Sequence, residues 1–176
     1  MRSGWYGFAS RHRAPVVGGI ILVGGLIFFL VRLRSGVTQP IAFNHNIHVE
    51  KLGLECSHCH QGVETNAFAT LPKAGICLEC HGSGPLSESP EEAKVRNYGE
   101  GKGEIPWTRL TRVPEHVYFS HQRHVKLGKV ACDNCHGRMQ ERTRPPRSAP
   151  KEISMNDCLE CHRKQGASVD CVSCHR

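Results

Sequence analysis

Five copies of the pattern Cys-x-x-Cys-His constrain this chain of 176 residues more than any other feature. Together they contain all ten cysteines, so no cysteine is left for another purpose. A disulfide framework would not explain a histidine after every second cysteine, and zinc sites would not explain the further histidine pairs described below. The pattern is typical of covalent haem c attachment, with two thioether bonds and a proximal histidine on the iron.

We therefore predict five covalently attached c-type haems. The predicted attachment residues are Cys56, Cys59, Cys77, Cys80, Cys132, Cys135, Cys158, Cys161, Cys171 and Cys174, and the predicted proximal ligands are His60, His81, His136, His162 and His175.

A longer repeat surrounds the first and third motifs. Residues 43–60 (FNHNIHVEKLGLECSHCH) and 119–136 (FSHQRHVKLGKVACDNCH) align without a gap. Each copy carries a His-x-x-His pair, His45 with His48 and His121 with His124, at the same distance from its motif. Residues at i and i+3 project from one side of a helical turn. Two such rings cannot easily serve one iron, so we expect one to be a distal ligand of the local haem and the other of a neighbouring haem.

Four distal ligands for five haems leave one position to fill. His116 completes the count, and Met155 and, more weakly, Met139 are alternatives. His12 precedes the long apolar run, and His58 lies inside its own motif, so neither is expected to reach an iron. A methionine ligand would raise the potential of its haem relative to bis-histidine haems. The count alone favours His116.

A long apolar run lies near the N-terminus. Ala14 to Val31 is 18 residues without a charged side chain, and it leads into Arg32-Leu33-Arg34. As a helix it would be about 27 Å long, which is enough to cross the hydrocarbon layer. A cleaved signal peptide usually has an apolar region of about 7–15 residues and a small-residue cleavage site. We therefore predict a retained single-pass anchor.

The domain boundaries follow from these features. Covalent attachment of haem to such motifs takes place outside the bacterial cytoplasm, so we expect an inner-membrane protein with a periplasmic haem domain. The expected parts are a cytoplasmic N-terminus (1–13), the transmembrane anchor (14–31), a linker (32–42) and a pentahaem domain (43–176) with repeat units 43–81 and 119–162 and a terminal haem at 171–175.

The haem domain is expected to be mainly irregular, with short α-helices around a haem core and almost no sheet. Its composition predicts an exposed loop over 82–106, which is rich in Gly, Pro, Ser, Glu and Lys, and a short helix over 153–162.

The formal charge of +7 does not indicate nucleic-acid binding. Five of the 23 basic residues flank the apolar run, and beyond residue 36 the excess is only +2. The negative charges of haem propionates would be partly compensated by this excess of basic residues. We expect no nucleic-acid partner.

Several segments carry a family resemblance: PIAFNHNIH (40–48), CHQGVET (59–65), PWTRL (106–110), VPEHVYFSHQRHV (113–125), CHGRM (135–139) and SMNDCLECHR (154–163). The pattern F-x-H-x-x-H-V ahead of a Cys-x-x-Cys-His motif resembles class III multihaem cytochromes. The combination resembles the membrane-anchored pentahaem cytochrome subunit of alternative complex III, a quinol-oxidising complex, and covers nearly the whole chain. That resemblance implies electron transfer from the complex to a periplasmic acceptor such as a small cytochrome c. It implies polytopic quinol-binding and iron–sulfur subunits as partners, and Met155 as the fifth distal ligand with His116 as the alternative.

Two other functions compete with this one. An autonomous membrane-anchored quinol dehydrogenase cytochrome would also have one N-terminal helix. A multihaem reductase would keep one haem open to substrate and often replaces a motif histidine with lysine, whereas all five motifs here end in histidine. We predict an electron-transfer subunit rather than an enzyme with a catalytic site of its own.

Overall fold

The computed structural model describes residues 13–34, 36–101 and 103–175 and divides into two units, Met1–Gly36 and Val37–Arg176. The described part of the first unit is helix α2 (Arg13–Arg34). Most of the predicted cytoplasmic segment, with His12, lies outside the described residues.

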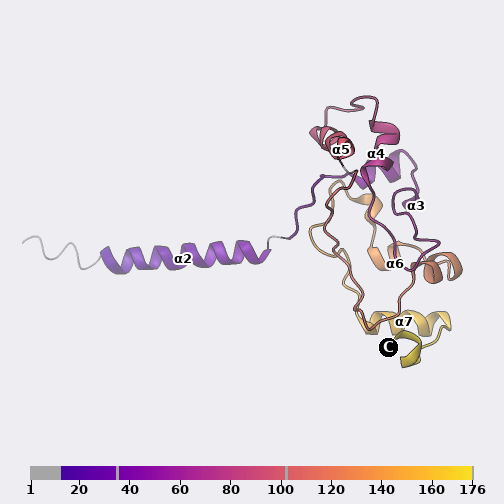
Figure 1. Ribbon diagram of the computed structural model, residues 1–176. Helices are drawn as coiled ribbons and strands as arrows, with labels where there is room; N and C mark the ends of the chain where they lie inside the picture. The colour runs from indigo at the N-terminus through magenta and orange to yellow at the C-terminus, as the bar shows by residue number, and fades with distance from the viewer. Residues whose placement is uncertain (1–12, 35, 102, 176) are drawn as a thin grey trace, which may run out of the picture. The chain divides into compact units, whose positions relative to one another are not determined.

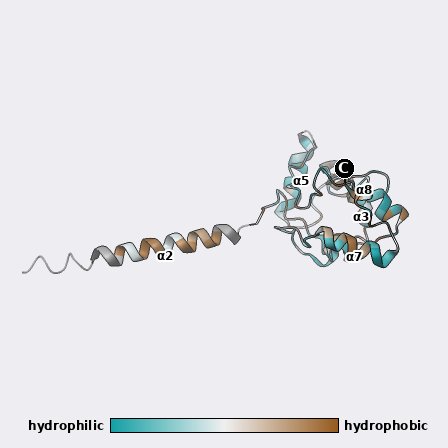
Figure 2. Ribbon diagram, turned by 90° about the horizontal axis from the view of Figure 1, so that it is seen from below, coloured by the Kyte–Doolittle hydropathy of each residue, from teal (hydrophilic) through white to brown (hydrophobic). Residues whose placement is uncertain are grey.

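Helix α2 carries the apolar run. Pro15 lies in its first turn, where the missing N–H has no partner to lose. The large apolar side chains from Val17 to Val31 are exposed, and Figure 2 shows their hydrophobic colouring along the middle of the helix. Within the residues that the structure describes, no helix meets the length and apolarity that a membrane crossing requires. The predicted anchor is therefore not confirmed.

The second unit consists of short helices joined by long irregular segments (Figure 1). An isolated bridge between Val117 and His175 is the one extended pairing found among its described residues. The prediction of short helices with almost no sheet is confirmed. The helices are η1 (Asn46–Lys51), α3 (Cys56–Cys59), α4 (Ala74–His81), α5 (Pro90–Glu100), η2 (Gln122–Leu127), α6 (Asp133–His136), η3 (Met139–Glu141), α7 (Met155–Gln165) and α8 (Cys171–Cys174).

The apolar core is small and lies where α4 meets α5. Four buried apolar residues form it: Ile41, Ala74, Val95 and Ile105. Trp107 packs against them and donates its indole N–H to the Pro72 carbonyl oxygen at 2.8 Å. A unit of this size with so few buried side chains needs another source of stabilisation, as small cofactor-dependent domains do.

Helix α5 contradicts the loop predicted over 82–106. Ser89 is its N-cap and accepts a hydrogen bond from Glu91 N at 3.3 Å. Pro90 occupies the first helical turn, and Glu91 and Glu92 follow it there, where negative charge suits the helix dipole. The loop prediction was wrong for residues 90–100, because it was based on the amino-acid composition of the segment and overlooked this signal for the start of a helix.

The predicted helix over 153–162 is confirmed as α7, which continues to Gln165. Ser154 and Asp157 form a reciprocal capping box at its start. Gly166 ends it with φ +67°, a left-handed conformation that glycine adopts without strain.

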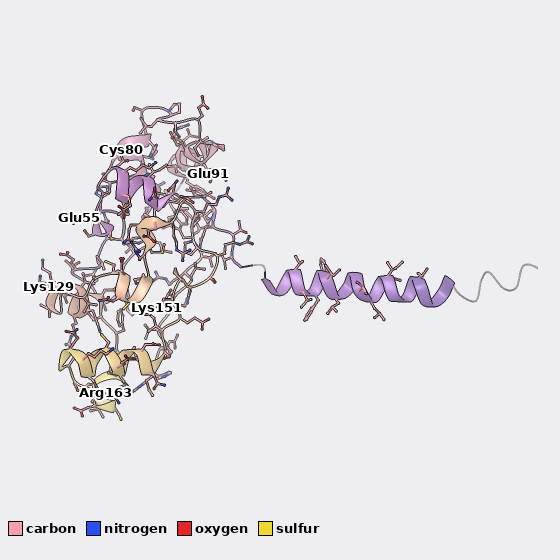
Figure 3. All side chains as sticks on the ribbon, turned by 180° about the vertical axis from the view of Figure 1, so that it is seen from behind. Glu55, Cys80, Glu91, Lys129, Lys151 and Arg163 are labelled. Atoms are coloured by element: carbon pink, nitrogen blue, oxygen red, sulfur yellow. The ribbon has the colours of Figure 1, made fainter. Side chains whose placement is uncertain are left out.

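The labelled side chains in Figure 3 show how the second unit is laid out along its length. Cys80 of α4 and Glu91 of α5 lie at one end, Glu55 just before α3 comes next, then Lys151, and Arg163 of α7 lies at the other end. The second motif, which contains Cys80, and the fourth, which Arg163 follows, therefore lie towards opposite ends of the unit, with Glu55 of the first-motif segment between them.

Candidate haem-binding sites

All ten cysteines have free thiols and lie on short helical turns or at their edges. Helices α3, α4, α6, α7 and α8 each carry or end one Cys-x-x-Cys-His motif. One helical turn brings both sulfurs and the following imidazole to the same side, as attachment to one macrocycle requires. The described residues contain no group of three or more His, Cys, Asp or Glu side chains suited to a bare metal ion.

The two His-x-x-His pairs lie at the start of π-helical segments. His45 is the N-cap of η1 and His121 the N-cap of η2, with His48 and His124 inside. Residues at i and i+3 are about 60° apart around an α-helix, but about 120° apart around a wider π-helix. The wider winding turns the two rings of a pair away from each other, as expected for ligands of different irons.

A phenylalanine holds each pair. Phe43 meets the His45 ring edge-on at 4.8 Å and stacks on His48 at 4.4 Å. Phe119 repeats this geometry, at 4.8 Å from His121 and 4.7 Å from His124. Phe43 and Phe119 begin the two aligned repeats, but the sequence alone suggested no role for them. Their occurrence at the same position in both repeats was the signal that could have indicated a role.

Four motif histidines face a second histidine ring. The ring centroids are 6.2 Å apart for His48 and His81, 6.3 Å for His121 and His136, 6.1 Å for His124 and His162, and 5.5 Å for His116 and His175.

These separations match a known requirement. A metal–imidazole nitrogen bond is about 2 Å long. Two rings on opposite sides of one metal therefore have centroids roughly 6 Å apart. Three of the pairs have that spacing, and His116 with His175 is somewhat closer. The residues present therefore fit haem iron held between two imidazoles.

His45 lies near the remaining motif histidine, His60. Burial lowers the pKa of His45 to about 4, with further contributions from the charges of His60, His48 and Arg142. The buried Nδ1 atom of His45 has no hydrogen-bond partner among the described residues. A neutral imidazole is the form that binds a metal.

Backbone carbonyl oxygens fix the orientation of five rings through Nδ1. The contacts are His48 with Asn44 O (2.8 Å), His60 with Thr70 O (3.2 Å), His121 with Ala67 O (3.1 Å), His124 with Ser120 O (2.8 Å) and His162 with Ser168 O (2.6 Å). Such contacts set the tautomer and leave Nε2 as the free ligand atom. This is the arrangement expected of iron ligands.

His81 differs, because its Nδ1 atom lies 3.3 Å from the Glu92 carboxylate. Glu92 is only 7% exposed. Hydrogen bonds from the Ser87 hydroxyl, above all, and from Leu86 N lower the pKa of Glu92 to about 2. Sequence reasoning missed Glu92 because it lies in the segment read as a loop.

The remaining candidates are placed as follows. Met155 is the first residue of α7 and is 61% exposed. Met139 begins η3. His58 pairs with Glu79 at 3.8 Å. Of the candidates for the fifth distal ligand, His116 lies with its ring stacked on that of a motif histidine, His175.

Neighbouring motifs come close through their thiols. Burial and then the Cys59 thiol raise the pKa of Cys77. Burial and then Cys132, which also hydrogen-bonds to it, raise the pKa of Cys56. The first motif therefore lies next to both the second and the third.

The other end of the unit continues the series. Burial, above all, raises the pKa of Cys158, and Cys135 and Cys174 raise it further. Tyr118 N donates to Cys174 O at 2.7 Å, which joins the fifth motif to the segment before the second repeat. The fourth motif thus lies between the third and the fifth.

The free thiols, the facing imidazoles and the carbonyl-bound Nδ1 atoms define a multihaem cytochrome c. Residues 117–176 match the family described as cytochrome c7 and related cytochrome c. The chain is also 31% identical, over 194 aligned residues, to the menaquinone reductase multiheme cytochrome c subunit of Nitratidesulfovibrio vulgaris (strain Hildenborough). The alignment covers 96% of this chain and 92% of that protein. The chain therefore belongs to the multihaem cytochromes c, which bind c-type haem covalently and transfer electrons.

Proposed function

We propose that the chain is the electron-relay subunit of a membrane-bound, quinone-reactive complex and carries five haems c. The facing imidazole rings, about 6 Å apart, are the observation that carries this proposal. Haem c, when bound, supplies a one-electron couple whose potential depends on its axial ligands and surroundings. At such a site the two imidazoles would both hold the iron, which would favour electron transfer over substrate binding.

Each site would use one motif histidine and one distal histidine. The proposed pairs are His60 with His45, His81 with His48, His136 with His121, His162 with His124, and His175 with His116. The ring contact at 5.5 Å supports His116, and the exposure of the side chain weighs against Met155. Each repeat then contributes one ligand to its own motif and one to the motif that follows it.

The electrostatic influence of neighbouring motif thiols on one another, together with the hydrogen bond between Cys56 and Cys132, supports a single row of sites. The order is second, first, third, fourth and fifth motif, because the first and third meet through Cys56 and Cys132. The two repeats thus meet in the middle, and their second ligands, His48 and His124, reach outward. A row has two ends, at α4 and at α8, where partners can deliver and accept electrons.

We also propose a direction of electron flow. The sequence resemblance implied flow from a quinol-oxidising complex, of the alternative complex III type, to a periplasmic acceptor. The relative's name is menaquinone reductase, which favours flow towards the quinone. We adopt the second direction. Polytopic quinone-binding and iron–sulfur subunits, and a small soluble cytochrome c as electron donor, are the proposed partners.

The location is also proposed. The uncharged run from Ala14 to Val31, whose described apolar side chains are exposed, supports a single-pass inner-membrane anchor. Covalent haem attachment supports a periplasmic position for residues 43–176.

Purification of the tagged full-length chain from membranes in detergent tests the proposal. We expect co-purifying membrane subunits and reduction of a menaquinone analogue by the complex once its haems are reduced. Faster menaquinol oxidation than quinone reduction would restore the direction implied by the resemblance. A chain that emerges alone and reacts with neither form contradicts the proposal.

A further inference from the structure

Helix α5 brings a buried carboxylate to the second motif. Its two buried residues are Glu92 and Val95, and it packs against α4. The approach is close: a Cβ atom at Gly99 would lie 2.3 Å from Leu78 Cδ1. A side chain at position 99 would therefore have to displace Leu78 for α5 to keep the position in which Glu92 reaches His81.

Two donors hold the Glu92 carboxylate. The Ser87 hydroxyl donates to Oε1 at 2.5 Å, and Leu86 N donates to Oε2 at 2.7 Å. Hydrogen bonds to a carboxylate favour its charged form. Arg96 Nη1 lies 3.8 Å from Oε2 and offsets part of the charge. Glu92 is therefore a buried negative charge at a defined position.

The Glu92 carboxylate lies beside a proposed iron ligand, His81. His81 Nδ1 lies 3.3 Å from Glu92 Oε2, and the contact falls short of hydrogen-bond geometry. The interaction is thus chiefly electrostatic. His60 and His162, which are also motif histidines, instead meet the neutral carbonyls of Thr70 and Ser168.

We infer that Glu92 is a positioning residue that lowers the reduction potential of the site formed by His48 and His81, at one end of the row. A carboxylate partner raises the basicity of a ligating histidine, and nearby negative charge favours the oxidised, more positive iron. The inference rests on the proposed ligand pairs. It distinguishes the site of His81, which has a carboxylate beside Nδ1, from those of His60 and His162, whose Nδ1 atoms meet backbone carbonyls.

The test is a potentiometric titration of the full-length holoprotein, followed by electron paramagnetic resonance of the low-spin ferric haems. The variant His48→Ala first identifies the relevant signal, which should disappear. Glu92→Gln should then raise the potential of that signal alone. We expect at least a tenfold change in its reduced-to-oxidised ratio at fixed ambient potential, which is about 59 mV for one electron.

Glu91→Gln is the matched control. Glu91 accepts from Ala42 N and pairs with Lys94, and no contact joins it to His81 among the described groups. Its loss should leave all potentials unchanged. Arg96→Gln provides a change of opposite sign, because it removes the positive charge beside Glu92 and should lower the same potential.

The outcomes separate the two proposals. If His48→Ala leaves every low-spin signal in place, the ligand pairs are wrong and the inference falls with them. If that signal disappears but Glu92→Gln leaves its potential unchanged, or shifts all five equally, only the role of Glu92 is overturned. If the Glu92→Gln variant does not accumulate with haem, Arg96→Gln decides the role of Glu92. An unchanged potential of the His48–His81 signal in Arg96→Gln overturns that role, and a lowered potential supports it.

Discussion

Substitution of His124 by alanine tests the idea that each repeat binds two different irons. The His124 ring is fixed by Ser120 O at 2.8 Å and faces His162 of the fourth motif at 6.1 Å. Removal of the ring leaves His162 as the only imidazole at that site. Alanine supplies no ligand atom, so the iron there should become high-spin.

The expected magnitude follows from the five proposed haem sites. If one of the five changes, the integrated low-spin ferric signal should fall by about one fifth, and a high-spin signal of equal amount should appear. The covalent haem content should not change, because Cys158 and Cys161 remain. His58→Ala is the matched control, because that ring pairs with Glu79 and faces no motif histidine among the described contacts.

A second background shows which site loses its ligand. In a variant with serine at both Cys158 and Cys161, the fourth haem is not attached. In that background, His124→Ala should cause no further loss of the low-spin ferric signal. A further loss of one site would show that His124 serves the third motif, and an unchanged low-spin signal in the single variant would refute its role as a ligand.

Three other predictions use different observations. His116→Met should raise one potential and leave four unchanged, whereas Met155→Leu should change none; a redox titration that shows the reverse restores Met155 as the ligand. Phe119→Ala removes the ring that meets His121 edge-on and stacks on His124, and it should broaden two low-spin signals in frozen-solution spectra; sharp, unshifted signals would show that Phe119 does not orient these two proposed ligands. Ser154→Ala breaks the capping box of α7 and should reduce stability by about 1 kcal/mol in chemical unfolding of the holoprotein, with Ser173→Ala as control.

The sequence predicted the chemistry of the sites better than their arrangement. Motif spacing is a local property, so the attachment cysteines and motif histidines could be predicted without a fold. The repeated His-x-x-His pairs suggested two different irons, but which ring faces which depends on π-helical winding and on Phe43 and Phe119. That winding is not readable from the spacing alone.

The segment around Glu92 is a case in which reasoning from the sequence failed. Its composition resembled that of a loop, yet a Ser-Pro-Glu-Glu start is a helix signal, and packing of α5 on α4 buries the carboxylate. Whether a glutamate is exposed or lies beside a proposed iron ligand depends on how separate segments of the chain pack together. The choice between His116 and Met155 is of the same kind, because His116 and His175 are far apart along the chain.

The most direct measurement is the intact mass of the natively produced chain, denatured and treated with a thiol-alkylating reagent. Thioether bonds survive denaturation, so we predict a mass increased by five haems and by no alkyl group, because all ten cysteines are used. A mass with fewer haem additions, or with alkylated cysteines, would contradict a row of five covalently held haems.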